Sequence, residues 1–249
     1  MAIKNSKILN SKISKPSLSK PRERKLGGFS LIELALVLTI AGFSIGAGLV
    51  VFNEYARISK ISNTKLKLQE ILYAIDDYAD KFNRLPCPAD GTDKFGDPNF
   101  GVSIRGAASC TNVNGSTGVT MGMVPVSTLN LYPTFGLDAW NRRISYVVHA
   151  ASVDDDGMDS TANDLDLENY DGSSNYNDVV VVLISHGENG FGAYNGRGGA
   201  KSAVPIGTNA AEVLNTQVTG AFRASVSVAS FDDVVYFWTR DQITDDSME

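Results

Sequence analysis

The sequence predicts an α+β protein in which one long N-terminal helix packs on an antiparallel sheet of about three to five strands. Two observations lead to this prediction. Residues 29–82 lack proline and pass from a continuous apolar run to apolar residues spaced three and four apart, as in an amphipathic helix. Residues 137–238 contain short runs rich in β-branched and aromatic residues between glycine- and aspartate-rich stretches, as in strands joined by turns.

The first 28 residues form a basic segment without an apolar period. They contain eight Lys or Arg residues and one acid, Glu23, and therefore carry +7. Since the whole chain carries −6, the remaining 221 residues carry −13. Lys and Arg beside a membrane span stay on the cytoplasmic side, so the acidic body is expected on the far side of the membrane. An acidic body also argues against nucleic acid as a partner, because a nucleic-acid groove requires clustered Lys and Arg.

The long helix begins with a segment apolar enough to cross a bilayer. No charged residue occurs from Leu34 to Phe52, and roughly 20 apolar residues span a hydrocarbon core as a helix. A secretory signal has a shorter apolar core that is followed by its cleavage site. Glu33 lies at the entry of the segment, and a charge at the bilayer centre costs about 2.5–3.5 kcal/mol. Glu33 is therefore either a boundary acid that reaches the headgroups or a buried acid that needs a positive partner.

Residues 53–85 continue the helix with a single apolar stripe, and Pro86 and Pro88 end it. Residues 86–249 are expected to form the globular α+β region. It should start with a long irregular section that extends to residue 130. The elements expected after it are a turn and strand at 137–148, a buried strand at 179–185, a short helix near 210–215 and strands at 222–228 and 231–238.

Cys87 and Cys110 are the only cysteines. In an exported domain an even count favours a disulfide, and this one would close a loop of roughly 24 residues, worth about 3 kcal/mol. The alternative is a pair of unbonded, small apolar side chains. Two cysteines without a matching pair of histidines do not make a zinc site.

An acidic stretch provides weak candidates for a metal site. Asp154, Asp156 and Asp159 could hold Ca²⁺, which binds several oxygen ligands from a flexible loop. Their spacing does not match an EF-hand, because Ser152 stands where the first Asp is required. A solvated acidic loop is therefore favoured, and no other cofactor is expected.

Ser185 and His186 suggest a hydrolase, with an acid from the aspartate-rich loop as the third member. Consecutive side chains of a strand point to opposite faces, so these two cannot easily meet. Ser185 also does not lie in the G-x-S-x-G motif of a nucleophile elbow, because Leu183 stands where the first glycine is required. We therefore expect no enzymatic activity.

Gly28, Phe29 and Glu33, followed by the apolar run, resemble the class III leader of type IV prepilins and type II secretion pseudopilins. The resemblance implies that a prepilin peptidase cleaves after Gly28 and methylates the new N-terminal Phe29. It also implies that Glu33 pairs with the freed amino group of a neighbouring Phe29 and so sets the register between subunits. This family has a pilin-like fold, with one long helix on an antiparallel sheet.

A second resemblance lies in the globular region. Asp138, Trp140 and Tyr146 match the D-x-W-G-x-x-x-x-Y hairpin signature of many pseudopilins, although Asn141 replaces the glycine. Together the resemblances imply four segments: a leader (1–28) that is removed, a transmembrane and filament-core half of the helix (29–52), an amphipathic periplasmic half (53–85) and a periplasmic globular region (86–249).

The function implied is that of a structural subunit of a type IV pilus or a type II secretion pseudopilus. A mature length of 221 residues is large for a repeated shaft subunit and favours a minor one. The chain would be a single-pass protein of the bacterial inner membrane before it enters a helical fibre. Its partners would be other pilin or pseudopilin subunits, the prepilin peptidase and methyltransferase, and the inner-membrane assembly platform. The alternative is a bitopic, membrane-anchored periplasmic binding domain that does not polymerise.

Overall fold

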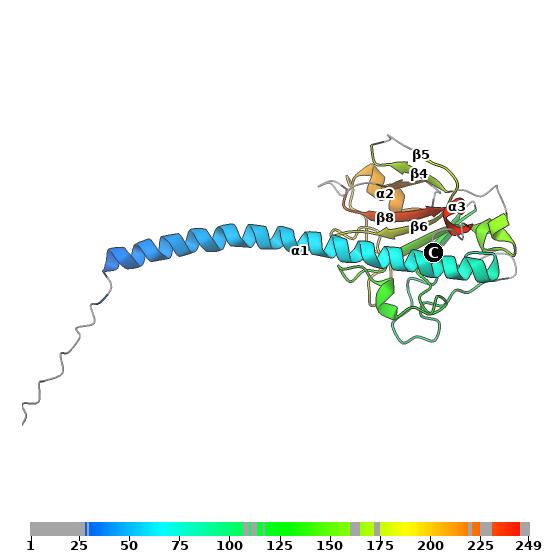
Figure 1. The fold of residues 1–249 in the computed structure, drawn as a ribbon, viewed down its shortest axis with the longest axis horizontal. Coiled ribbons are helices and arrows are strands. Elements are labelled where there is room, and N and C mark those ends of the chain that lie inside the picture. Colours follow the sequence, from blue (N-terminus) through cyan, green and yellow to red (C-terminus); the bar gives the residue numbers. More distant parts are fainter. Residues whose placement is uncertain are drawn as a thin grey trace, which may run out of the picture. The chain divides into compact units, whose positions relative to one another are not determined.

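In the computed structural model the chain divides into two units, residues 1–50 and residues 51–249. The structure describes residues 28, 30–106, 110, 114–116, 118–159, 165–171, 175–218, 221–224 and 231–244. Figure 1 shows the element order, which begins with the predicted long helix and continues into a mainly antiparallel β region. The predicted α+β class is confirmed.

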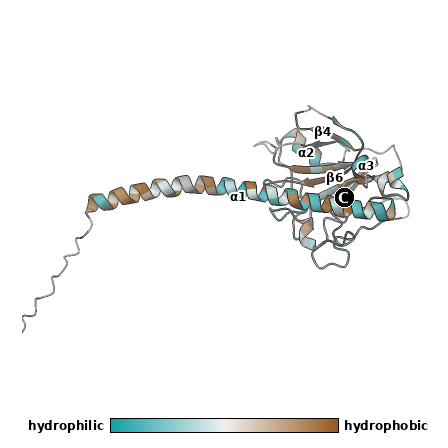
Figure 2. Cartoon of the chain, viewed as in Figure 1, coloured by the Kyte–Doolittle hydropathy of each residue, from teal (hydrophilic) through white to brown (hydrophobic). Residues whose placement is uncertain are grey.

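The first unit contains the N-terminal part of helix α1 (Leu31–Phe82). The backbone N–H of Leu34 donates to Ser30 O at 3.0 Å, so the helical hydrogen bonds begin there. The described side chains from Leu31 to Leu49 are all exposed, and Figure 2 shows the brown colour of hydrophobic residues along this part. Among the described residues, α1 is the one helix long and apolar enough to cross a membrane.

The second unit contains the rest of α1, whose apolar stripe is buried. Leu68, Ile71, Leu72 and Ile75 are at most 1% exposed, at the spacing of three and four residues that the sequence predicts. The helix ends at Phe82, because the next residue, Asn83, takes a φ of 50° outside the helical region.

A five-stranded antiparallel sheet, the large sheet, packs on this stripe. Its strand order is β1-β2-β3-β6-β8, with β8 at one edge. The strands are β1 (Asn114–Ser116), β2 (Val119–Met123), β3 (Ser145–His149), β6 (Val179–Ser185) and β8 (Val234–Thr239).

A second sheet of three strands, the small sheet, covers the other face of the large sheet. Its order is β5-β4-β7, and the β4–β7 pair is parallel. The elements of this layer are β4 (Asp166–Asn169), β5 (Asn175–Tyr176), β7 (Ala221–Ala224) and helix α2 (Ala210–Thr216). The described part of the chain also contains short helices: η1 (Pro133–Gly136), η2 (Ala150–Val153), η3 (Gly157–Asp159) and α3 (Arg240–Thr244).

Two hydrophobic cores follow from these three layers. Val181 and Leu183 of β6 face the core on the α1 side, whereas Val182 and Ile184 face the core shared with the small sheet. All seven residues of β6 are therefore buried. A strand covered on both faces reads as a continuous apolar run rather than an alternating one, which explains why the sequence identified β6 with its correct bounds.

The structure differs from the sequence-based expectation in the section 83–130 and in the small sheet. Strand β2 lies within the section expected to be irregular, because Gly122 and the flanking glycines weaken its strand pattern. The parallel β4–β7 pair joins residues 55 positions apart, which no local pattern indicates. Strand β8 begins at Val234 rather than 231, and the expected strand residues 225–228 lie outside the described residues.

The disulfide between Cys87 and Cys110 is confirmed, with Cα atoms 5.5 Å apart. It lies in the irregular section that follows α1, and Cys87 is part of the core on the α1 side. The bridge therefore ties this section to the packed helix.

Replacing both Cys87 and Cys110 by Ser should lower the free energy of unfolding by about 3 kcal/mol, because the unfolded chain regains the entropy of the opened loop. Urea unfolding followed by circular dichroism measures the loss. The reduced wild-type chain is the control and should lose the same amount. Equal stability of the oxidised and reduced chains would contradict the prediction.

Candidate functional site

The residues predicted to direct processing and assembly lie at the start of α1. Gly28 is exposed, and a Cβ added there would meet no other heavy atom within 4 Å. Phe29 lies outside the described residues. Glu33 is exposed in the first turn of α1, where an acid interacts favourably with the helix dipole. The structure thus places Glu33 at the N-terminal end of the apolar surface.

The apolar surface of the first unit is extensive. Its large side chains are between 51% and 87% exposed: Leu31, Ile32, Leu34, Leu36, Val37, Leu38, Ile40, Phe43, Ile45 and Leu49. A contiguous apolar surface of this kind marks contact with a membrane or with another protein. This part of the helix is therefore a candidate for a membrane anchor or a protein-contact surface.

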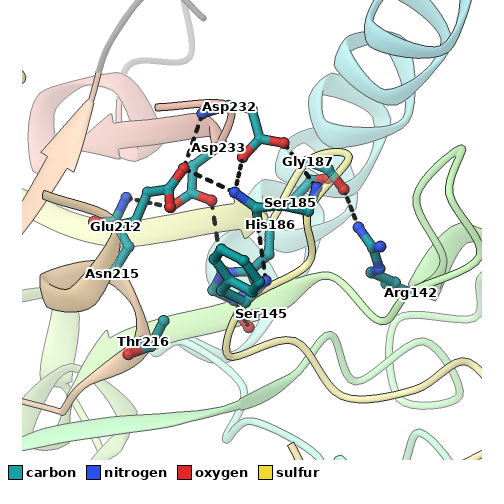
Figure 3. A network of polar contacts seen from close by, with 12 residues as sticks. Arg142, Ser145, Ser185, His186, Gly187, Glu212, Asn215, Thr216, Asp232 and Asp233 are labelled. Carbon is teal, nitrogen blue, oxygen red and sulfur yellow. Dashed lines mark hydrogen bonds and ion pairs between the residues drawn. The ribbon is translucent and has the colours of Figure 1, made fainter. Parts of the chain in front are cut away.

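A second group of candidate residues forms a buried polar cluster at the end of β6 (Figure 3). His186 directly follows β6 and is fully buried. Its Nε2 atom lies 3.0 Å from Ser145 Oγ on β3, and its Nδ1 atom lies 3.8 Å from Asp233 Oδ1, next to β8. Ser145 and Asp233 are also buried. The three side chains stand in a row that resembles a Ser–His–Asp triad, with Ser145 and His186 fully buried and Asp233 2% exposed.

Ser185, the nucleophile candidate from the sequence, has a different partner. Its Oγ donates to Asp138 Oδ2 at 2.7 Å, while His186 contacts Ser145. The sequence could not single out Ser145, because the contact depends on the pairing of β3 with β6, in which Ser145 lies opposite Ile184. Asp138 also accepts the N–H groups of Trp140 and Arg142 and so stabilises the turn before β3.

Three carboxylates meet beside His186. One oxygen each from Glu212, Asp232 and Asp233 lie within 4.8 Å of one another. Asn189 Nδ2 donates to Glu212 Oε1 at 3.0 Å and to Asp232 Oδ1 at 2.6 Å. Asn215 Nδ2 donates to Asp233 Oδ2 at 2.8 Å. The amides thus hold the carboxylates of α2 and of the β8 start close together.

Burial shifts the proton affinity of the cluster. The pKa of His186 is lowered to about 3 by burial and by the charges of Lys201 and Arg142, so the imidazole is neutral at pH 7. The pKa of Asp233 is raised well above its usual value by burial and by the nearby Glu212 and Asp232 carboxylates. Burial is also the main cause of the raised pKa of Glu212.

The turn after His186 has a local requirement for glycine. Gly187 has a φ of 53°, and a Cβ there would collide with the backbone of Asp232. The guanidinium of Arg142 donates to the carbonyls of Gly187 and Glu188. The close approach of this turn to the start of β8 brings His186 and Asn189 to the carboxylates.

The acidic loop has partners other than a metal ion. Asn83 Nδ2 donates to Asp156 Oδ1 and Asp159 Oδ2. Asp154 lies 3.7 Å from Arg105, and Asp155 pairs with Arg84 and Arg105. A hydrogen bond from Arg105 is the main cause of the lowered pKa of Asp155. Nothing in these contacts singles out Ca²⁺, and calcium binding here stays a prediction.

A groove of about 690 Å³ opens between α1 and the edge of β8. Ile58 and Ile61 line it from α1, Val235 and Phe237 from β8, and Tyr176 from β5. Arg57 lies at this groove and pairs with Glu54 and Glu188. Apolar and polar side chains both line the groove, and its charged side chains come mainly from α1.

The chain matches no model of a known protein family, no curated protein and no solved structure.

The free energy of unfolding should depend on pH through His186. Between about pH 6.5 and pH 3 the unfolded state holds more protons on this histidine than the folded state, so its contribution to stability is lost as the pH falls through that range, by up to ~1.4 kcal/mol per pH unit. Between pH 7 and pH 4 the free energy of unfolding, measured at each pH, should change less steeply with pH for His186→Gln than for the wild type.

His149→Gln is the matched control, because His149 is the other histidine and is only half-buried. Comparing slopes removes both the contributions of the carboxylates and any constant loss of stability in the variant. If the free energy of unfolding changed with pH at the same slope in the wild type and in His186→Gln, the buried histidine would not be the source of the pH dependence.

Proposed function

We propose that this chain is a prepilin-like structural subunit, matured by cleavage after Gly28 and methylation of Phe29. It then assembles into a helical fibre through the apolar part of α1. The observation that carries the proposal is the combination of a wholly exposed apolar helix segment with an acid, Glu33, in its first turn. The helix continues into an α+β region, the architecture of pilin-like proteins.

Glu33 favours assembly over simple anchoring. Lipid satisfies the apolar side chains of α1, but it offers no partner to a carboxylate that enters the hydrocarbon. In a bundle of packed helices the free α-amine of a neighbouring Phe29 supplies the positive charge. A buried carboxylate is retained where such a partner and its hydrogen bonds are present.

The turn before β3 supports the resemblance to pseudopilins. Asn141 stands where their hairpin signature has glycine, and its φ is 62°. This left-handed conformation suits glycine best, and Asn is among the few other residues that adopt it readily. At this position Asn141 therefore adopts a backbone conformation that glycine also adopts readily.

A prepilin-like subunit of this kind has a defined membrane topology and a defined set of partners. The basic leader keeps the N-terminus in the cytoplasm, and the acidic globular region lies in the periplasm. A mature chain of 221 residues suits a minor subunit of a type IV pilus or a type II secretion pseudopilus. Its partners are the neighbouring subunits, the processing peptidase and methyltransferase, and the assembly platform of the inner membrane.

The alternative is a membrane-anchored binding domain that does not polymerise. The groove between α1 and the edge of β8 favours this alternative, because aromatic and aliphatic side chains line a concave surface large enough for a ligand. Such a domain would keep its leader, and Glu33 would make no difference to it.

Two measurements separate these functions. Intact mass and N-terminal sequencing of the membrane-extracted chain, from cells with and without prepilin peptidase, should show loss of residues 1–28 and gain of one methyl group only where the peptidase is present. Glu33→Gln should then be processed normally but be depleted from sheared fibres, because its positive partner is lost.

Glu54→Gln is the matched control, since Glu54 lies on the same helix beyond the uncharged segment and pairs with Arg57. It should enter fibres as the wild type does. An unprocessed N-terminus in the presence of the peptidase would overturn the proposal and leave the membrane-anchored binding domain.

A further inference from the structure

We propose that Glu212, Asp232, Asp233 and His186 form a binding site for one divalent transition-metal ion, for which Mn²⁺ and Zn²⁺ are suitable probes. The site lies within the second unit, where the start of β8 meets α2 and the turn after β6. It does not depend on how the chain is processed or assembled.

The cluster brings three acidic side chains together without a nearby basic side chain from the described residues. Three carboxylates from two segments converge within 4.8 Å, and Glu212 and Asp233 are buried. No Lys or Arg of the described part of the chain lies within 4.0 Å of any of the three. Buried carboxylates of like charge require protons or a cation.

His186 directs a ring nitrogen without a hydrogen-bond partner toward the cluster. Its Nδ1 atom is buried, has no hydrogen-bond partner and points toward Asp233 Oδ1 at 3.8 Å. This distance is too long for a hydrogen bond. Two bonds of about 2.1 Å to a shared ion allow ligand atoms up to about 4.2 Å apart. The gap therefore fits an ion bound between the two side chains better than a direct contact.

The contact of the other ring nitrogen with Ser145 is compatible with the tautomer that a metal needs. With Nε2–H donating to Ser145 Oγ at 3.0 Å, the lone pair is on Nδ1 and faces Asp233. Histidine ligands of metal ions are commonly oriented in this way by a hydrogen bond from the second nitrogen.

The nitrogen ligand decides the type of ion. Ca²⁺ is bound almost entirely by oxygen atoms, whereas imidazole together with carboxylates suits Mn²⁺, Zn²⁺ and related ions. Binding would replace the two hydrogen bonds that Asn189 Nδ2 now donates to Glu212 and Asp232. The ion would join α2 to the start of β8 and to the end of β6, so its binding energy would stabilise the fold.

The test uses the full chain in detergent, without a polyhistidine tag, after treatment with a chelator. Calorimetric titration with Mn²⁺ or Zn²⁺ should show one ion bound per chain and a raised melting temperature. Asp233→Asn should weaken binding by about tenfold or more. Asp138→Asn is the matched control, because Asp138 is equally buried but lies outside the cluster, and it should bind as the wild type does.

Pulsed electron paramagnetic resonance of the Mn²⁺-loaded wild type tests the same site without a variant, and it decides the question if Asp233→Asn does not fold. It should detect one imidazole nitrogen coupled to the ion, and the signal should persist in His149→Gln. Three results would each overturn the proposal: no stoichiometric binding of Mn²⁺ or Zn²⁺, binding unaffected by Asp233→Asn, or bound ion without nitrogen coupling. The first would indicate that protons, rather than a metal, neutralise the cluster.

Discussion

The packing of the apolar stripe of α1 on the large sheet is the contact on which the rest of the second unit depends. Leu68, Ile71, Leu72 and Ile75 fill the core on that side, and fully burying a side chain of this type contributes about 1.5–3 kcal/mol. The stripe fixes which face of the sheet the helix covers. The opposite face of the large sheet is left to the small sheet, and β6 is consequently enclosed on both sides.

The enclosure of β6 explains why the polar cluster lies where it does. Every side chain from Val179 to Ser185 is buried, so the first residues after the strand are still inside the protein when the chain turns at Gly187. His186 is placed there without access to water, and its polar atoms must find partners within the protein. Ser145 satisfies one nitrogen, and Asp233 faces the other at a distance that leaves it without a hydrogen bond.

How much the sequence could predict depends on how local each feature is. The long helix and β6 were predictable because periodicity and apolar runs are properties of neighbouring residues. The disulfide was predictable because Cys87 and Cys110 are the only cysteines. The small sheet and the cluster were not, since the β4–β7 pair and the Ser145–His186–Asp233 row join residues 40–60 positions apart. Strand register decides such contacts, and no spacing along the chain encodes it.

The exposed segment of α1 differs from the buried cluster in that the sequence alone already identifies it. There the structure adds little to the sequence, because no described residue of the chain covers Glu33 or the surrounding Leu and Ile side chains. The aliphatic side chains would be satisfied by lipid or by protein alike. A carboxylate is selective, because only a partner that carries positive charge offsets its desolvation. Glu33 is therefore the residue that distinguishes a subunit built to pack against its neighbours from a domain that is merely anchored.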